Sequence, residues 1–304
     1  MKAMHIYLKI ALLIMISIAN SCTSKQSEYT VPDEILMEHL KFSPYTDPCE
    51  YGYLYDALPE SFPEICNRIK KQLIHPFDTK KYSDKIPSER VYEDREIPTV
   101  KSMLEKLLER DEKGLTSSRL PENRLVVACV HHSLLLASIL RSRGVPARIR
   151  AGYATYIGKD RNIKVSHVVC EVWDQIEKKW IFVDPDRNKV DFPRHQFELA
   201  ADVWESLRKN TLNKSKYISR YETVEQATVH LLCHDLSYII GDEVPYWLDP
   251  PIVKKSKAGI SQLTENELLK LDELARFIKK PDVYRDMLAK MQRETALFQF
   301  DDDH

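Results

Sequence analysis

Three residues between positions 129 and 184 have the types and the order that a cysteine nucleophile needs. Cys129 opens an apolar helical pattern, His167 lies in the second strand-like segment that follows, and Asp184 ends the third. A helix N-terminus favours the thiolate over the thiol, because it presents free N–H groups and a partial positive charge. A histidine can then act as base and proton donor, while a carboxylate orients the imidazole. The pattern predicts a triad of Cys129, His167 and Asp184.

A helix and a small sheet must position this triad. Residues 129–142 are apolar on nearly all sides, which predicts a helix inside a core that ends near Gly144. Three segments rich in Val, Ile, Tyr and Trp follow, separated by polar turns, at 147–157, 164–173 and 179–183. A helix followed by hairpin-linked strands predicts an α+β fold with an antiparallel sheet.

The flanking segments are expected to be mostly helical. Seven prolines between residues 29 and 95 permit only short helices, such as one at 63–73, and residues 100–110 carry an amphipathic stripe. After Pro193 the pattern predicts helices at 196–209, 224–239, 265–279 and 283–296. Thr264 and Glu267 form a capping box for the third of these, and Pro281 is expected at the start of the last.

The first residues have the pattern of a targeting segment. A charged start precedes an apolar run at 10–16, which is too short to span a bilayer because a spanning helix needs about 20 apolar residues. Cys22 follows the small residue Ser21, as in the lipobox of bacterial lipoproteins, although Asn20 makes the match irregular. A plain secretory signal is the alternative. We expect lipidation at Cys22 and a lipid-anchored location at the cell envelope.

The length of 304 residues gives room for two domains or one elaborated domain. We predict four parts: a signal peptide at 1–21, a tether and proline-rich wrap at 22–95, a catalytic core at 96–190 and a helical extension at 191–304. The net charge of -1 argues against a nucleic-acid partner, and no Gly-rich phosphate-binding loop is found among the 7 glycines. We expect no cofactor and no metal.

Several motifs resemble the transglutaminase-like superfamily. They are CVHHSLLLASILR at 129–141, GVPAR at 144–148 and GY at 152–153, followed by His167 with EVW at 171–173 and by WIFVDP at 180–185. The specific likeness covers residues 124–187, and a fainter one to a bacterial subgroup runs from about 40 to 300. The resemblance implies a papain-like cysteine enzyme that acts on amides. The chain departs from the family at Val168-Val169 and from the subgroup at Val130-His131-His132, so the substrate class is not carried over.

Other readings of the same residues are open. Cys129, His131, His132, His167 and Cys170 have ligand types suited to zinc, but alternation along a strand separates His167 from Cys170, which we expect in the core. We also expect His132 to form a core hydrogen bond rather than to line a groove, and Arg148 to pair with a buried carboxylate. Four cysteines, at 49, 66, 170 and 233, allow three disulfide pairings, and the sequence does not choose among them.

The predicted function is acyl transfer from a peptide or protein amide substrate through a thioester on Cys129. The alternative is a binding or scaffold lipoprotein that keeps the fold without turnover. Along the sequence no tryptophan neighbours Cys129 or His167, so we expect water rather than an amine to accept the acyl group. The backbone N–H of Cys129 is the expected first oxyanion donor. The sequence identifies neither the second donor nor the oligomeric state.

Overall fold

The predicted buried helix is present as α5 (Cys129–Ser142) in the computed structural model, which describes residues 30–158, 160 and 162–300. All of its residues from Val130 to Arg141 are buried. The chain leaves the helix through Gly144, whose φ of +70° lies in the left-handed region that favours glycine. The predicted signal peptide and Cys22 lie outside the described residues.

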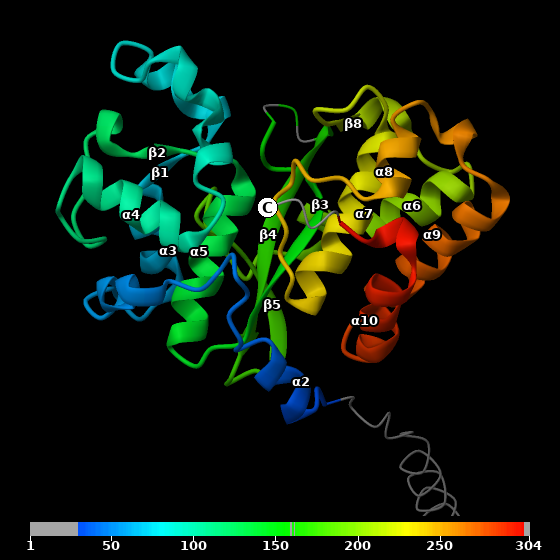
Figure 1. The fold of residues 1–304 in the computed structure, drawn as a ribbon, viewed down its shortest axis with the longest axis horizontal. Coiled ribbons are helices and arrows are strands. Elements are labelled where there is room, and N and C mark those ends of the chain that lie inside the picture. Colours follow the sequence, from blue (N-terminus) through cyan, green and yellow to red (C-terminus); the bar gives the residue numbers. More distant parts are fainter. Residues whose placement is uncertain (1–29, 159, 161, 301–304) are drawn as a thin grey trace, which may run out of the picture. The chain divides into compact units, whose positions relative to one another are not determined.

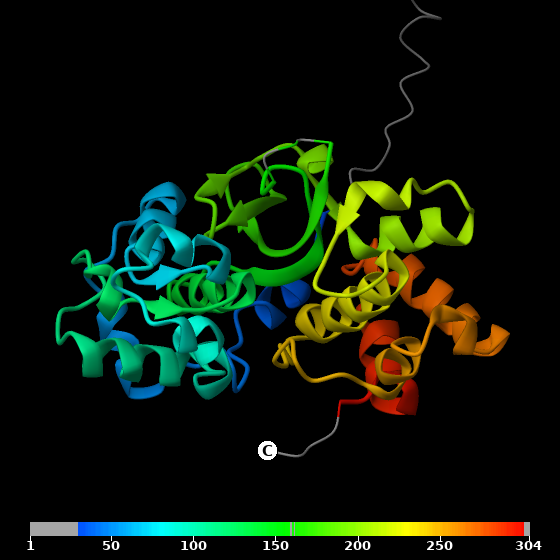
Figure 2. The ribbon, with the colours of Figure 1, turned by 90° about the horizontal axis from the view of Figure 1, so that it is seen from above.

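The three predicted strands form the centre of the sheet. They are β3 (Ala147–Ala154), β4 (Lys164–Asp174) and β5 (Lys179–Asp184), each antiparallel to the next. Two short strands extend the sheet to the order β6-β5-β4-β3-β7, and a third pairs with the start of β4: β6 (Lys189–Val190), β7 (Phe197–Leu199) and β8 (Tyr217–Ile218). Helix α5 contacts β3 and β4, whereas α7 (Val224–Ile240) contacts β3 (Figure 1). Figure 2 shows the strong curl of the sheet. The α+β prediction is confirmed.

The prediction of a helix over 196–209 is wrong at its start. Residues Phe197–Leu199 form strand β7, and helix α6 (Ala200–Arg208) begins only afterwards. Strand β7 pairs with β3 opposite Gly152, where a Cβ atom would lie 2.2 Å from the Glu198 carbonyl oxygen. Glycine at this position therefore permits the close approach of the missed strand.

The other predicted helices are present, with one corrected boundary. Helices α3 (Phe62–Lys70), α4 (Val100–Arg110) and α9 (Glu265–Ile278) match the predictions, and the predicted capping box begins α9. The last long helix, α10 (Arg285–Glu294), starts after a turn at residues 281–284, so Pro281 does not open it. None of the helices in the described part of the chain is long and apolar enough to cross a membrane.

Short elements complete the described chain. The remaining α-helices are α2 (Asp33–Glu38) and α8 (Pro251–Ser256), and β1 (Leu73–Ile74) pairs in parallel with β2 (Leu125–Val126). The 3-10 helices are η1 (Cys49–Tyr55), η2 (Pro76–Tyr82), η3 (Ser88–Glu96), η4 (Pro121–Asn123), η5 (Arg194–Gln196), η6 (Lys214–Lys216), η7 (Ile260–Gln262) and η8 (Ala296–Phe298). One core cluster joins residues from Leu54 to Phe298, so the wrap, the sheet and the C-terminal helices share a hydrophobic interior.

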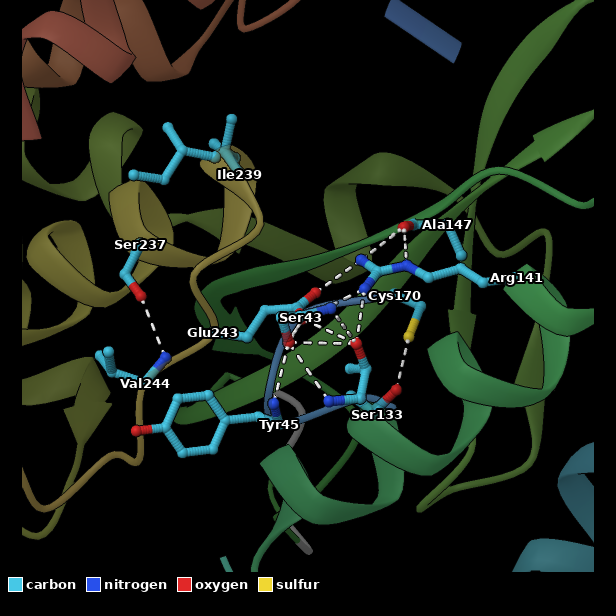
Figure 3. A network of polar contacts seen from close by, with 12 residues as sticks. Ser43, Tyr45, Ser133, Arg141, Ala147, Cys170, Ser237, Ile239, Glu243 and Val244 are labelled. Carbon is cyan, nitrogen blue, oxygen red and sulfur yellow. Dashed lines mark hydrogen bonds and ion pairs between the residues drawn. The ribbon is translucent and has the colours of Figure 1, made fainter. Parts of the chain in front are cut away.

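A buried ion pair anchors the C-terminal end of α5 (Figure 3). Arg141 donates to Glu243 Oε1 at 2.5 Å and to Oε2 at 3.1 Å, and it also donates to the Ala147 carbonyl oxygen at 2.9 Å. Ser43 donates to the same carboxylate at 2.5 Å. Because both charged side chains are buried and their polar atoms are paired, this cluster ties α5 to the N-terminal segment and to the loop after α7.

Removing one partner of this pair should destabilise the protein. Arg141→Met leaves the Glu243 carboxylate buried without its cation, which costs about 3–5 kcal/mol in the free energy of unfolding. Urea unfolding followed by circular dichroism measures the change. The control Arg276→Met removes an exposed pair with Glu273, 3.8 Å apart, and should change the free energy by less than about 0.5 kcal/mol. Equal effects of the two variants would contradict the anchoring role.

Candidate active site

The register of β4 and β5 brings His167 and Asp184 together. Val183 pairs with Cys170, so His167 and Asp184 lie on one face of the sheet, two residues apart in register. The imidazole Nε2–H donates to Asp184 Oδ2 at 2.8 Å, and both side chains are buried. This hydrogen bond leaves Nδ1 as the ring nitrogen available to Cys129.

Two further donors hold the Asp184 carboxylate. The Arg187 backbone N–H donates to Oδ1 at 3.0 Å, and the Tyr156 hydroxyl donates to Oδ2 at 2.8 Å. The Tyr156 ring also meets the His167 ring edge-on, with centroids 6.2 Å apart. Sequence reasoning missed Tyr156, although it falls at the end of a predicted strand. Its hydroxyl fixes the carboxylate that orients the histidine.

Cys129 is the first residue of α5 and is half-buried. Its backbone N–H belongs to the first turn, where no intrahelical acceptor exists. Burial disfavours the thiolate, but the charge of His167 and hydrogen bonding to His167 and His75 outweigh it and lower the pKa of the thiol to about 6.

The two buried partners of Cys129 are shifted toward their charged forms. Burial opposes the charge on His167, yet Asp184 and the Cys129 thiolate together raise the pKa of the imidazole well above its ordinary value. Burial likewise opposes ionisation of Asp184, but His167, Tyr156 and Arg187 lower the pKa of this carboxyl. The arrangement favours a thiolate–imidazolium pair beside a carboxylate, which is the charge state that a cysteine nucleophile uses.

Sequence reasoning also missed His75, which lies 54 positions before the cysteine in the chain. It directly follows β1, whose partner β2 leads into α5, and the Val127 N–H donates to the Ile74 carbonyl oxygen at 3.0 Å. His75 Nδ1 accepts a hydrogen bond from the Phe77 backbone N–H at 3.1 Å. In the sequence, the only feature that marks His75 is its position between the apolar pair Leu73-Ile74 and Pro76. The pairing with β2 could not be read from the sequence.

The neighbouring residues take the structural roles expected of them. Cys170 is buried against α5, where its thiol lies 3.4 Å from the Ser133 carbonyl oxygen, and burial raises its pKa. His132 Nδ1 lies 3.2 Å from the Ala128 carbonyl oxygen, and burial lowers the pKa of His132 to about 4. Arg148 donates to the buried carboxylate of Glu171 at 2.8 Å and also pairs with Asp282.

None of the four cysteines considered for disulfides forms one, because the five cysteines in the described residues are all free. Cys170 faces α5, whereas His167 faces the opposite side of the sheet, so the five residues weighed as a zinc site do not form one ligand set. A different group in the described residues, His230, His234 and Asp249, could hold a metal ion, since its ligand atoms lie within 4.8 Å of one another. Hydrogen bonding of His230 to Asp249 at 3.0 Å and the ion pair of Asp249 with Lys257 already join much of this group.

A tryptophan does lie near the start of α5, which corrects the premise drawn from neighbours in the sequence. The Trp247 ring stacks on His131 at 6.2 Å between centroids, and Tyr246 meets the same histidine edge-on at 6.4 Å. Both come from the loop after α7. In the described residues, Tyr156 is the aromatic side chain whose ring meets that of His167. Burial raises the pKa of Tyr246 and the charge of Cys129 contributes to this shift, so this aromatic surface extends from His131 towards the nucleophile.

Comparison with known proteins gives one match. Residues 118–185 match the family model of the transglutaminase-like superfamily, and this range contains Cys129, His167 and Asp184. Neither the curated proteins nor the solved structures gave a match to the chain. The family match and the mixed helix and antiparallel-sheet architecture agree with the likeness seen in the motifs. The segment at 118–185 is thus similar to the transglutaminase-like superfamily both in its sequence and in its mixed helix and sheet architecture.

Proposed function

We propose that this protein is a cysteine-dependent amide or peptide hydrolase, or acyltransferase, that works through a thioester on Cys129. The proposal rests on the charges of three neighbouring side chains: a thiolate, an imidazolium and a carboxylate. The conditions at Cys129 and His167 favour thiolate and imidazolium, and Asp184 accepts a hydrogen bond from the imidazole at 2.8 Å. Buried cysteines with a structural role instead have raised pKa values, as Cys170 and Cys233 do here.

The proposed reaction follows from these positions. The Cys129 sulfur forms a bond to the carbonyl carbon of an amide, and the π electron pair moves to the oxygen. When the carbonyl re-forms, the C–N bond breaks and the His167 imidazolium gives its Nδ1 proton to the departing amine. Neutral His167 then takes a proton from the incoming nucleophile as that nucleophile bonds to the thioester carbon, and the C–S bond breaks to return the Cys129 thiolate beside the imidazolium. Asp184 keeps the imidazole in the required orientation throughout.

Water is the proposed acceptor of the acyl group. A transferase excludes water with an apolar amine channel beside the cysteine. The His131 and Trp247 rings stack on each other and meet Tyr246, which lies near Cys129, and this one aromatic wall does not make a closed channel. A scaffold without turnover, the competing proposal, accounts for the unusual Val130-His131-His132 but gives no reason for a lowered thiol pKa.

We also propose that the protein acts at the cell envelope on peptide or protein amides, held by a lipid on Cys22. The support is the sequence pattern at residues 10–22.

Substitutions in the triad should have graded effects on turnover. On an amide substrate found by peptide screening, Cys129→Ala and His167→Ala should nearly abolish kcat, and Asp184→Asn should lower it by up to roughly 10⁴-fold. Tyr156→Phe keeps the ring and removes one hydrogen bond to Asp184, so its loss should be far smaller. A variant of Cys129 or His167 that keeps most of its activity would remove that residue from the mechanism.

The acceptor is tested by product partition. With a primary amine added at rising concentration, free acid should remain the main product, because water reaches the thioester without a selective channel. Mass spectrometry of the two products measures the ratio. Amide as the main product at modest amine concentration would make the enzyme a transferase.

The anchor is tested by membrane fractionation. Cys22→Ala should release the protein from membranes or block its processing, because it removes the thiol that would carry the lipid. The matched variant Cys49→Ala changes an exposed cysteine of the folded part and should leave fractionation unchanged. Unaltered membrane association of the Cys22→Ala protein would refute the proposed anchor.

A further inference from the structure

The two-stranded parallel sheet of β1 and β2 sets His75 beside the nucleophile. Its register pairs Leu73 with Leu125 and Ile74 with Val126, and it continues in the hydrogen bond from the Val127 N–H to the Ile74 carbonyl oxygen. One residue after Ile74 is His75, and two residues after Val127 is Cys129. The two chains therefore enter the site side by side, and the His75 ring interacts with the Cys129 thiol.

The hydrogen bond at Nδ1 of His75 determines whether Nε2, the other ring nitrogen, is a donor. Nδ1 accepts from the Phe77 backbone N–H at 3.1 Å, so the neutral ring carries its proton on Nε2. The ring is buried, and it also packs against the Phe77 ring with centroids 4.8 Å apart. His75 thus offers one fixed N–H donor to the neighbourhood of the sulfur.

Several other polar groups near Cys129 are occupied or have the wrong character. The Tyr156 hydroxyl donates to Asp184, and His132 Nδ1 lies against the Ala128 carbonyl oxygen. The Asp94 carboxylate accepts from Tyr246 at 2.8 Å and from the Ala128 N–H at 3.4 Å, so it is a hydrogen-bond acceptor. His167 is needed for proton transfer. His75 supports the thiolate, but it takes no part in the proton transfers of the proposed reaction.

We propose that His75 is the second oxyanion donor of this site. This assignment rests on the proposed acyl chemistry. As the Cys129 sulfur adds to the carbonyl carbon, the oxygen gains the π electron pair and accepts hydrogen bonds from the His75 Nε2–H and the Cys129 backbone N–H. Neither proton is transferred. Both hydrogen bonds weaken when the C–N bond breaks and the carbonyl re-forms. Such donors act on the transition state because the negative charge develops there.

Two variants separate the functions of the two ring nitrogens. His75→Asn keeps an acceptor near Nδ1 for the Phe77 N–H but lacks the distal donor. His75→Gln places an amide N–H near Nε2. The exposed His195→Asn is the matched control. The readouts are the burst of p-nitrophenolate from p-nitrophenyl acetate, which reports acylation, and iodoacetamide alkylation of Cys129, both at pH 9. Alkylation occurs at a saturated carbon and creates no oxyanion.

We expect His75→Asn to lower the acylation rate by roughly 10²–10³-fold, as loss of one oxyanion donor does elsewhere, while alkylation stays within about threefold of wild type. His75→Gln should recover most of the acylation rate, and His195→Asn should change neither rate. Should circular dichroism show the Asn variant to be unfolded, His75→Phe supplies a ring without the donor.

Three results would overturn the assignment. Acylation of the Asn variant at the wild-type rate would show that His75 donates nothing to the oxyanion. Parallel loss of acylation and alkylation at pH 9 would restrict His75 to supporting the sulfur. A wild-type protein that is alkylated at Cys129 but gives no burst would refute the proposed acyl chemistry itself, and this outcome is visible before any His75 variant is made.

Discussion

Burial of Asp184 as an anion is the constraint on which the rest of the site depends. A carboxylate removed from water needs nearby positive charge and hydrogen-bond donors. Asp184 has the imidazole of His167, the hydroxyl of Tyr156 and the backbone N–H of Arg187. Because the anion holds the proton on His167, the imidazolium in turn favours the ionised form of Cys129. The reactivity of the Cys129 sulfur therefore depends on Asp184, which acts on it through His167.

The scaffold holds this chain of charges by fixing α5 at both ends. At the C-terminal end, the buried pair of Arg141 and Glu243 ties the helix to segments far away in the sequence. At the N-terminal end, the pairing of β2 with β1 fixes the position at which α5 begins. The hydrophobic core between these anchors packs α5 against β3 and β4. A fixed helix matters because the sulfur must keep its position relative to an imidazole on a different element.

The parts of the fold that the sequence predicted are those set by local pattern. Long apolar helices and the three central strands have periodic signals, and the motif residues from Cys129 to Asp184 lie close enough in the chain to be seen together. His75, Tyr156 and Trp247 were missed because pairing of distant segments places them there. Strand β7 has three residues, too few for an alternating pattern. The sequence feature that marks it is Gly152 in its partner β3, where any larger residue would block its approach. The start of α10 differs because Pro281 lies in a turn.

The most direct test of the central claim is the pH dependence of Cys129 alkylation by iodoacetamide in the folded protein, followed by peptide mass spectrometry. Because only the thiolate reacts, the rate rises as pH rises through the pKa of the thiol. The pKa of Cys129 is lowered to about 6, so the rate should reach half its maximum near pH 6, while Cys66, with its pKa raised to about 12, stays unreactive. His167→Ala should move the midpoint upward. A wild-type midpoint near the ordinary thiol value of about 8.5, unchanged by His167→Ala, would contradict the ion pair on which the account rests.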